Sequence, residues 1–143
     1  MKRVFIAMLL ISVIFAGCKK DEKQTDTRDQ FVGNYNSTLT IQVPAIGWDD
    51  TFSRTYAFAK SSEAGKLTVT DDQGGNMTAV VTGNVFAYEK ETVTITNGGV
   101  TTTIEITGGG TISGNTITES GAYNVIFAGQ TYPGTWTCTH TRK

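Results

Sequence analysis

The sequence predicts an all-β fold, an antiparallel meander of short strands that closes as a β-barrel. From residue 31 onward threonine, glycine and β-branched residues dominate, and β-branched residues favour strands. Short alternating runs recur roughly every 8 to 12 residues and are separated by glycine-rich turns. No apolar pattern of period 3.6 is long enough for a core helix.

Each strand is expected as an alternating run bounded by a turn signal. The aromatic residues of "FSRTYAF" alternate after residue 51, and "KLTVT" precedes the polar turn "DDQGGN". The clearest hairpin is "TISGNTIT", where Gly114 and Asn115 suit a tight turn with positive φ. The other runs are "MTAVVT", "VFAYEK", "ETVTIT" and "VTTTIEIT", at residues 77–82, 85–90, 91–96 and 100–107.

Two architectures are compatible with about nine or ten strands in a meander. Open sheet edges invite aggregation, so the strands must either close into a barrel or fold into a two-sheet β-sandwich. Sequential hairpins favour the barrel, and the sandwich is the alternative.

The first residues have the layout of a secretory signal peptide. Lys2 and Arg3 precede about 13 mostly apolar residues, too few to span a bilayer comfortably. We therefore expect residues 1–17 to be removed. The residues around Cys18 resemble the lipobox of bacterial lipoproteins, in which this cysteine is lipidated, although Phe15 stands where the lipobox usually has Leu, Val or Ile. The alternative is an ordinary signal peptide with a chance cysteine.

Lipidation of Cys18 implies a stable membrane anchor, because two or three acyl chains such as palmitate hold firmly where one does not. The following "KKDE" resembles an export signal of surface lipoproteins in one Gram-negative phylum. The expected location is the outer membrane, lipid-anchored at the cell surface. Residues 18–29 carry many charges and no large apolar residue, so a disordered tether is expected before a barrel domain at residues 30–143.

Charge and cysteine content exclude several classes. Loss of Lys2 and Arg3 lowers the 12 basic residues to 10, against 13 acidic ones, which gives a formal net charge of −3. A nucleic-acid partner needs a basic face, so none is expected. With Cys18 lipidated, Cys138 is the remaining thiol, and we expect it to be buried in a monomer without disulfides or cofactors.

The barrel domain resembles small lipocalin-like surface lipoproteins of the same bacterial phylum. It shares their "D-x-F-V-G-x-Y" start at residues 29–35, their "G-T-I-S-G-N-T-I-T" hairpin at residues 110–118, and their "T-C-T-x-T-x-x" end at residues 137–143. This resemblance implies an up-and-down β-barrel and no settled biochemical activity.

Lipocalins also suggest how the barrel is closed. They begin with Gly-x-Trp, and that tryptophan packs under an arginine from the last strand. Here Gly33 and Tyr35 stand in place of Gly-x-Trp, and Arg142 lies on the last strand. The expected cation–π contact between Arg142 and Tyr35 is worth about 1 kcal/mol.

The polar residues contain no convincing catalytic or metal pattern. Cys138 and His140 face the same way from one strand, but they lack the further ligands that zinc requires. The acids of "DDQGGN" do not have the spacing of a calcium loop and are expected in a polar turn. Four glutamates on strands, Glu89, Glu91, Glu105 and Glu119, are expected to face solvent.

The expected function is non-catalytic binding of a small apolar or glycan-like ligand. Its candidate contacts are Trp48, expected in a loop, and the alternating Phe52, Tyr56 and Phe58, which are more typical of a core. The alternative is a structural or protein-interaction module of the cell envelope with a filled barrel. We expect no enzymatic activity.

Overall fold

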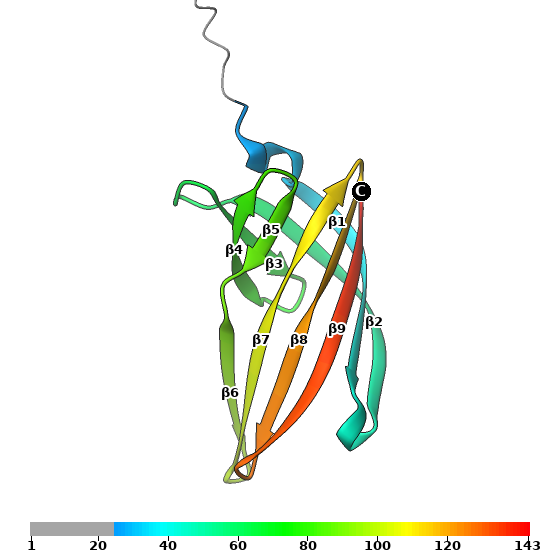
Figure 1. Ribbon diagram of the computed structural model, residues 1–143, viewed down its shortest axis with the longest axis vertical. Coiled ribbons are helices and arrows are strands. Elements are labelled where there is room, and N and C mark those ends of the chain that lie inside the picture. The colour runs from blue at the N-terminus through cyan, green and yellow to red at the C-terminus, as the bar shows by residue number, and fades with distance from the viewer. Residues whose placement is uncertain (1–24) are drawn as a thin grey trace, which may run out of the picture.

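The computed structural model describes residues 25–143, apart from the side chain of Asn97, and contains nine strands and two short 3-10 helices (Figure 1). The helices are η1 (Thr27–Gln30) and η2 (Pro44–Ile46). The strands are β1 (Gly33–Val43), β2 (Trp48–Lys60), β3 (Lys66–Asp71), β4 (Asn76–Thr82), β5 (Val85–Tyr88), β6 (Glu91–Asn97), β7 (Val100–Ser113), β8 (Thr116–Phe127) and β9 (Gln130–Arg142).

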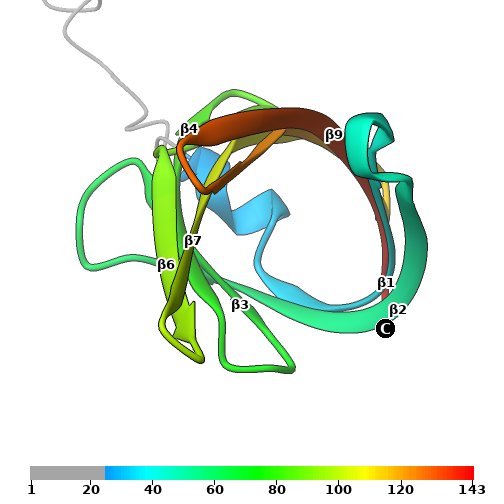
Figure 2. The same cartoon turned by 90° about the horizontal axis from the view of Figure 1, so that it is seen from below.

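The strands form one antiparallel sheet that closes on itself. Its order is β5-β4-β3-β2-β1-β9-β8-β7-β6, and β5 also pairs with β7. This last pairing closes the ring that Figure 2 shows from one end. The predicted all-β barrel is confirmed, and the two-sheet sandwich is wrong because β1–β9 and β5–β7 hydrogen bonds join what would be separate sheets.

The barrel is closed in one half of its length and open in the other. β5 and β6 lie end to end along β7, on residues 109–111 and 100–106 respectively. β3 pairs with the second part of β2 only, from Tyr56 to Lys60. In the open half, the first part of β2 and the outer side of β6 are therefore sheet edges, which stand apart in Figure 1.

Aromatic side chains fill the closed half. Phe31, Tyr35, Phe58 and Phe86 are at most 2% exposed, and their rings meet edge to face at centroid distances of 5.2–5.8 Å. This arrangement is preferred by aromatic quadrupoles. The strand pairings and this core, as far as the structure describes the chain, lie within residues 31–142, so residues 25–143 include all of the described sheet and core.

The ordered domain begins earlier than the predicted boundary at residue 30. Thr27–Gln30 forms η1, which is capped by the Asp26 carboxylate. The guanidinium of Arg28 donates to Asp26 and to the backbone carbonyls of Ser61, Glu63 and Lys66. The end of the expected tether is therefore wrong: these bonds fix its last residues to the β2–β3 connection. The expected signal peptide and Cys18 lie outside the described residues.

Two turns follow their predicted chemistry. Gly114 has a φ of +59° between the paired residues Ser113 and Thr116, as a two-residue hairpin requires. Asp71 accepts hydrogen bonds from the backbone N–H groups of Gln73 and Gly75, which makes the β3–β4 connection a polar turn.

The described part of the chain contains no helix of sufficient length and apolarity to cross a membrane.

Candidate functional site

The open half of the barrel holds a cavity of about 280 Å³. Its walls are mainly apolar and come from most of the strands. They include Leu39, Ile41, Tyr56, Val69, Met77 and Trp136. Asp71, Asn76 and Glu91 lie at the wall formed by β3, β4 and β6, while Glu119 and Cys138 belong to β8 and β9.

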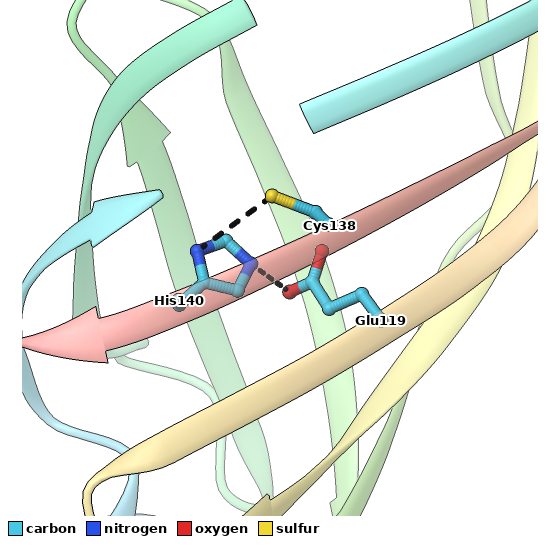
Figure 3. A group of neighbouring side chains, drawn as sticks. All are labelled: Glu119, Cys138 and His140. Atoms are coloured by element: carbon cyan, nitrogen blue, oxygen red, sulfur yellow. Dashed lines mark hydrogen bonds and ion pairs between the residues drawn. The ribbon is translucent and has the colours of Figure 1, made fainter. Parts of the chain in front are cut away.

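Three polar side chains meet between this cavity and the filled half of the barrel (Figure 3). Glu119 pairs with Cys138 across the β8–β9 ladder, and His140 follows two residues later on β9. Alternation along the strands therefore points all three side chains inward. They are 6%, 2% and 0% exposed, respectively, and one potential ligand atom from each lies within 4.8 Å of the others.

Further hydroxyl groups contact this cluster. The Oγ of Ser37 lies 2.7 Å from Nδ1 of His140, and the hydroxyl of Tyr88 donates to Oε1 of Glu119 over 2.8 Å. The Sγ of Cys138 lies 4.0 Å from the same Nδ1. The rings of Tyr56 and Phe58 flank the imidazole at centroid distances of 5.0 and 5.3 Å, so that water is excluded from it on this side.

Burial determines the protonation of the groups that contact Glu119. Burial raises the pKa of the Cys138 thiol, and the charge of Glu119 raises it further. The pKa of Tyr88 is raised well above its usual value by burial and then by Glu119, to which it donates. The thiol of Cys138 and the hydroxyl of Tyr88 are therefore both neutral at pH 7.

The other ring nitrogen of His140 has an unusual environment. Nε2 lies 3.1 Å from Oε1 of Glu119, which is close enough for an ion pair. The same nitrogen nevertheless has no hydrogen bond of acceptable direction. The approach of Nε2 to Glu119 is therefore a close contact and not a hydrogen bond, because a short distance alone does not make a hydrogen bond.

The prediction that all four strand glutamates face solvent is wrong for Glu119. Its inward position follows from the β8–β9 register, which places it opposite the buried Cys138. Two-residue alternation with the buried Ile117 is a local signal that would have placed it on the core face. Cys138 is buried, as predicted.

The four candidate ligand contacts, Trp48, Phe52, Tyr56 and Phe58, do not form one surface. Tyr56 lines the cavity, whereas Phe58 is packed into the closed half. Phe52 is half-buried beneath the guanidinium of Arg54, 5.4 Å from the ring centroid.

The sequence predicts that Trp48 lies in a loop. This prediction is wrong, because Trp48 pairs with Val43 at the start of β2. Its indole packs edge to face on Tyr123, 5.8 Å between centroids, and donates to Asp50. The half-buried ring therefore packs on the rim of the barrel rather than projecting freely.

The residues expected to close the barrel lie together at its other end. Arg142 pairs with Tyr35 across the β1–β9 ladder, and its guanidinium carbon lies 5.4 Å from the ring centroid. Arg142 also donates to the Tyr35 hydroxyl over 2.8 Å and to the carbonyl of Gln30. The backbone of Gly33 lies beside this arginine.

The fold and the cavity define an up-and-down β-barrel that is filled at one end and hollow at the other. No known protein family matches the sequence, and no curated protein does. A solved structure of a protein of unknown function from the DUF3598 family of Nostoc punctiforme PCC 73102 is similar, with 12% identity and a TM-score of 0.49. The match covers 80% of this chain and 48% of that protein, so this chain spans about half its length.

Proposed function

We propose that the protein is a surface-anchored lipoprotein whose barrel binds a small, mainly apolar ligand without catalysing a reaction. The observation that carries this proposal is the cavity of about 280 Å³ in the open half. Pockets for small molecules are concave and mostly apolar, with a few polar groups that orient the ligand. This cavity has that composition, and its volume suits a ligand of modest size.

The lining favours an apolar ligand over a glycan-like one. Leu39, Ile41, Val69 and Met77 present aliphatic surface, which a polyhydroxylated ligand would leave without hydrogen bonds. Tyr56 and the other aromatic residues of the wall add flat apolar surface. The polar groups of the wall, Asp71, Asn76 and Glu91 on β3, β4 and β6 and Glu119 on β8, are few and would orient a polar substituent of such a ligand.

Binding is tested with residues 25–143 and N-phenyl-1-naphthylamine, a fluorescent apolar probe. We expect saturable enhancement of fluorescence with one site per chain. Met77→Trp fills the cavity and should weaken binding about tenfold or more, which corresponds to about 1.4 kcal/mol. Val80→Trp is the matched control, because Val80 lies on the same strand and is 44% exposed.

The two tryptophan variants separate binding in the cavity from adsorption to the surface. Equal affinity of Met77→Trp and Val80→Trp for the probe, or an enhancement that never saturates, would contradict the proposed cavity. The midpoint of thermal unfolding of each variant establishes that the barrel is intact during the measurement.

The anchor is tested separately in intact cells. We expect Cys18→Ala to move the protein from the membrane fraction to the soluble fraction, because the change removes the lipid attachment site. Protease added to intact cells should degrade the wild-type domain. Continued membrane retention of Cys18→Ala would refute lipidation at this residue, and protection from protease in intact but not lysed cells would refute surface exposure.

The second candidate function is a protein-interaction module of the envelope. It is favoured by β6, which pairs only with β7 among the described strands and carries the exposed Val93 and Ile95. An unpaired edge of this kind can add a strand from a partner. This alternative was expected to have a filled barrel. Only the closed half is filled, since the open half contains the cavity.

A further inference from the structure

Three side chains of the types that bind transition metals meet where the cavity adjoins the filled half of the barrel. Glu119, Cys138 and His140 offer a carboxylate oxygen, a thiol sulfur and an imidazole nitrogen, all within 4.8 Å of one another (Figure 3). Two of them leave β9 at a two-residue spacing, and the third lies on the adjacent β8. A paired sheet holds such a set on a rigid support, which favours a defined coordination geometry.

The environment of His140 provides an independent observation. Its Nε2 is completely buried and 3.1 Å from Oε1 of Glu119, but the oxygen lies off the direction of N–H donation. A shared proton requires a nearly linear arrangement. A tetrahedral metal ion bonded to both atoms instead lies at the corner of a bent nitrogen–metal–oxygen angle. The direction of the contact between Nε2 of His140 and Oε1 of Glu119 therefore fits a metal ion bound by both atoms better than a hydrogen bond between them.

The surrounding hydroxyl groups suit the same purpose. Histidines that bind a metal usually donate their other ring N–H to an oxygen, and coordinating carboxylates accept hydrogen bonds of their own. Ser37 lies 2.7 Å from Nδ1 of His140, and Tyr88 donates to Glu119. With Ser37 as acceptor, the proton resides on Nδ1 and the lone pair of Nε2 is available.

We propose that Glu119, Cys138 and His140 bind one divalent transition-metal ion of the zinc class. A thiolate and a carboxylate neutralise the charge of such an ion, which a buried site requires. Thiolate and imidazole ligands select zinc over magnesium or calcium. Tetrahedral bonds of zinc place ligand atoms about 3.3–3.8 Å apart. The ligand atoms of the cluster lie within 4.8 Å of one another, so the widest separation contracts by up to about 1.5 Å on binding.

The fourth coordination position faces the cavity, because Glu119 and Cys138 are part of its lining. It is available to water or to a donor atom of a bound molecule. Binding of the metal ion needs no apolar ligand, so this inference is independent of the proposed function and is tested without the fluorescent probe.

The test uses cobalt(II) as a spectroscopic substitute for zinc in residues 25–143, where Cys138 is the single cysteine. Chelator-treated protein is titrated with cobalt(II) in the absence of oxygen. We expect one ion per chain, the intense visible absorption of a tetrahedral centre, and a near-ultraviolet charge-transfer band from thiolate to cobalt. Added zinc should displace the cobalt and remove these bands.

Variants assign the ligands. Cys138→Ser should abolish the charge-transfer band, and Glu119→Gln should weaken binding by at least about 100-fold, more than loss of an outer contact. Ser37→Ala should weaken it about 10- to 100-fold. Glu91→Gln is the matched control, since this carboxylate lines the same cavity outside the cluster, and affinity should change less than about twofold.

The wild-type titration decides the proposal without any variant. A folded chain that takes up no cobalt, or gives only the weak absorption of a six-coordinate ion without a charge-transfer band, overturns it. Equal losses for Glu119→Gln and Glu91→Gln would also overturn it, because they would indicate diffuse attraction to the acidic wall.

Discussion

Tyr35→Ala is expected to lower the free energy of unfolding by about 4 kcal/mol, the range for removal of a large buried aromatic side chain. The ring is completely buried and packs on Phe58 at 5.2 Å between centroids. Its hydroxyl donates to the carbonyl of Phe31 and accepts from Arg142, so one residue links η1, β1 and β9. Urea unfolding followed by circular dichroism measures the change.

Tyr35→Phe is the matched control for this prediction. It keeps the ring in place but leaves the Phe31 carbonyl and the Arg142 guanidinium each without one partner. The expected loss is about 1–2 kcal/mol, the usual cost of an unsatisfied buried polar group. A loss below about 1 kcal/mol for Tyr35→Ala would show that the closed half tolerates a void there, which contradicts a tightly packed barrel end.

Gly121→Ala is expected to destabilise the barrel by about 3 kcal/mol, at the upper end for overpacking. A Cβ atom at this position would lie 1.9 Å from the carbonyl oxygen of Thr107 and 2.5 Å from Nε1 of Trp136. Both atoms are fixed, because this indole nitrogen donates to that carbonyl over 3.1 Å. The added methyl group must therefore push β7, β8 or the indole away.

Since Trp136 lines the cavity, the same variant should also weaken binding of the fluorescent probe. Ser120→Ala is the neighbouring control: Ser120 is exposed, and its unfolding free energy should change by less than about 0.5 kcal/mol. Equal stability of the two variants would mean that the strands separate easily at Gly121, against the close approach seen here. Thermal unfolding of both variants provides the comparison.

Local patterns were sufficient for the fold class. Two-residue alternation marks strands, and Gly114 marks a hairpin, because both signals arise within a few residues of backbone. The same alternation correctly placed Cys138 and His140 on one face of the last strand, and burial of Cys138 was predicted; the structure shows that this face points inward. Arg142 was placed near Tyr35 by a resemblance, and the β1–β9 ladder brings them into contact.

The candidate site depended on pairings that local patterns do not specify. Glu119 joins His140 only because the β8–β9 register places it opposite Cys138. Ser37 reaches the imidazole from β1, 103 residues away in sequence. Local patterns also could not show which aromatic residues line the cavity. Tyr56 and Phe58 lie on one strand, but Tyr56 lines the cavity and Phe58 packs in the closed half.

An antiparallel β domain, its main turns and the shared face of Cys138 and His140 could be predicted from local patterns, because these follow from backbone geometry and the hydrophobic effect over short distances. That the barrel is filled at one end and hollow at the other could be seen only in the folded chain. That outcome depends on where β3 stops pairing with β2 and where β5 gives way to β6 along β7. Strand register also brought Glu119, Cys138 and His140 together between the cavity and the filled half of the barrel.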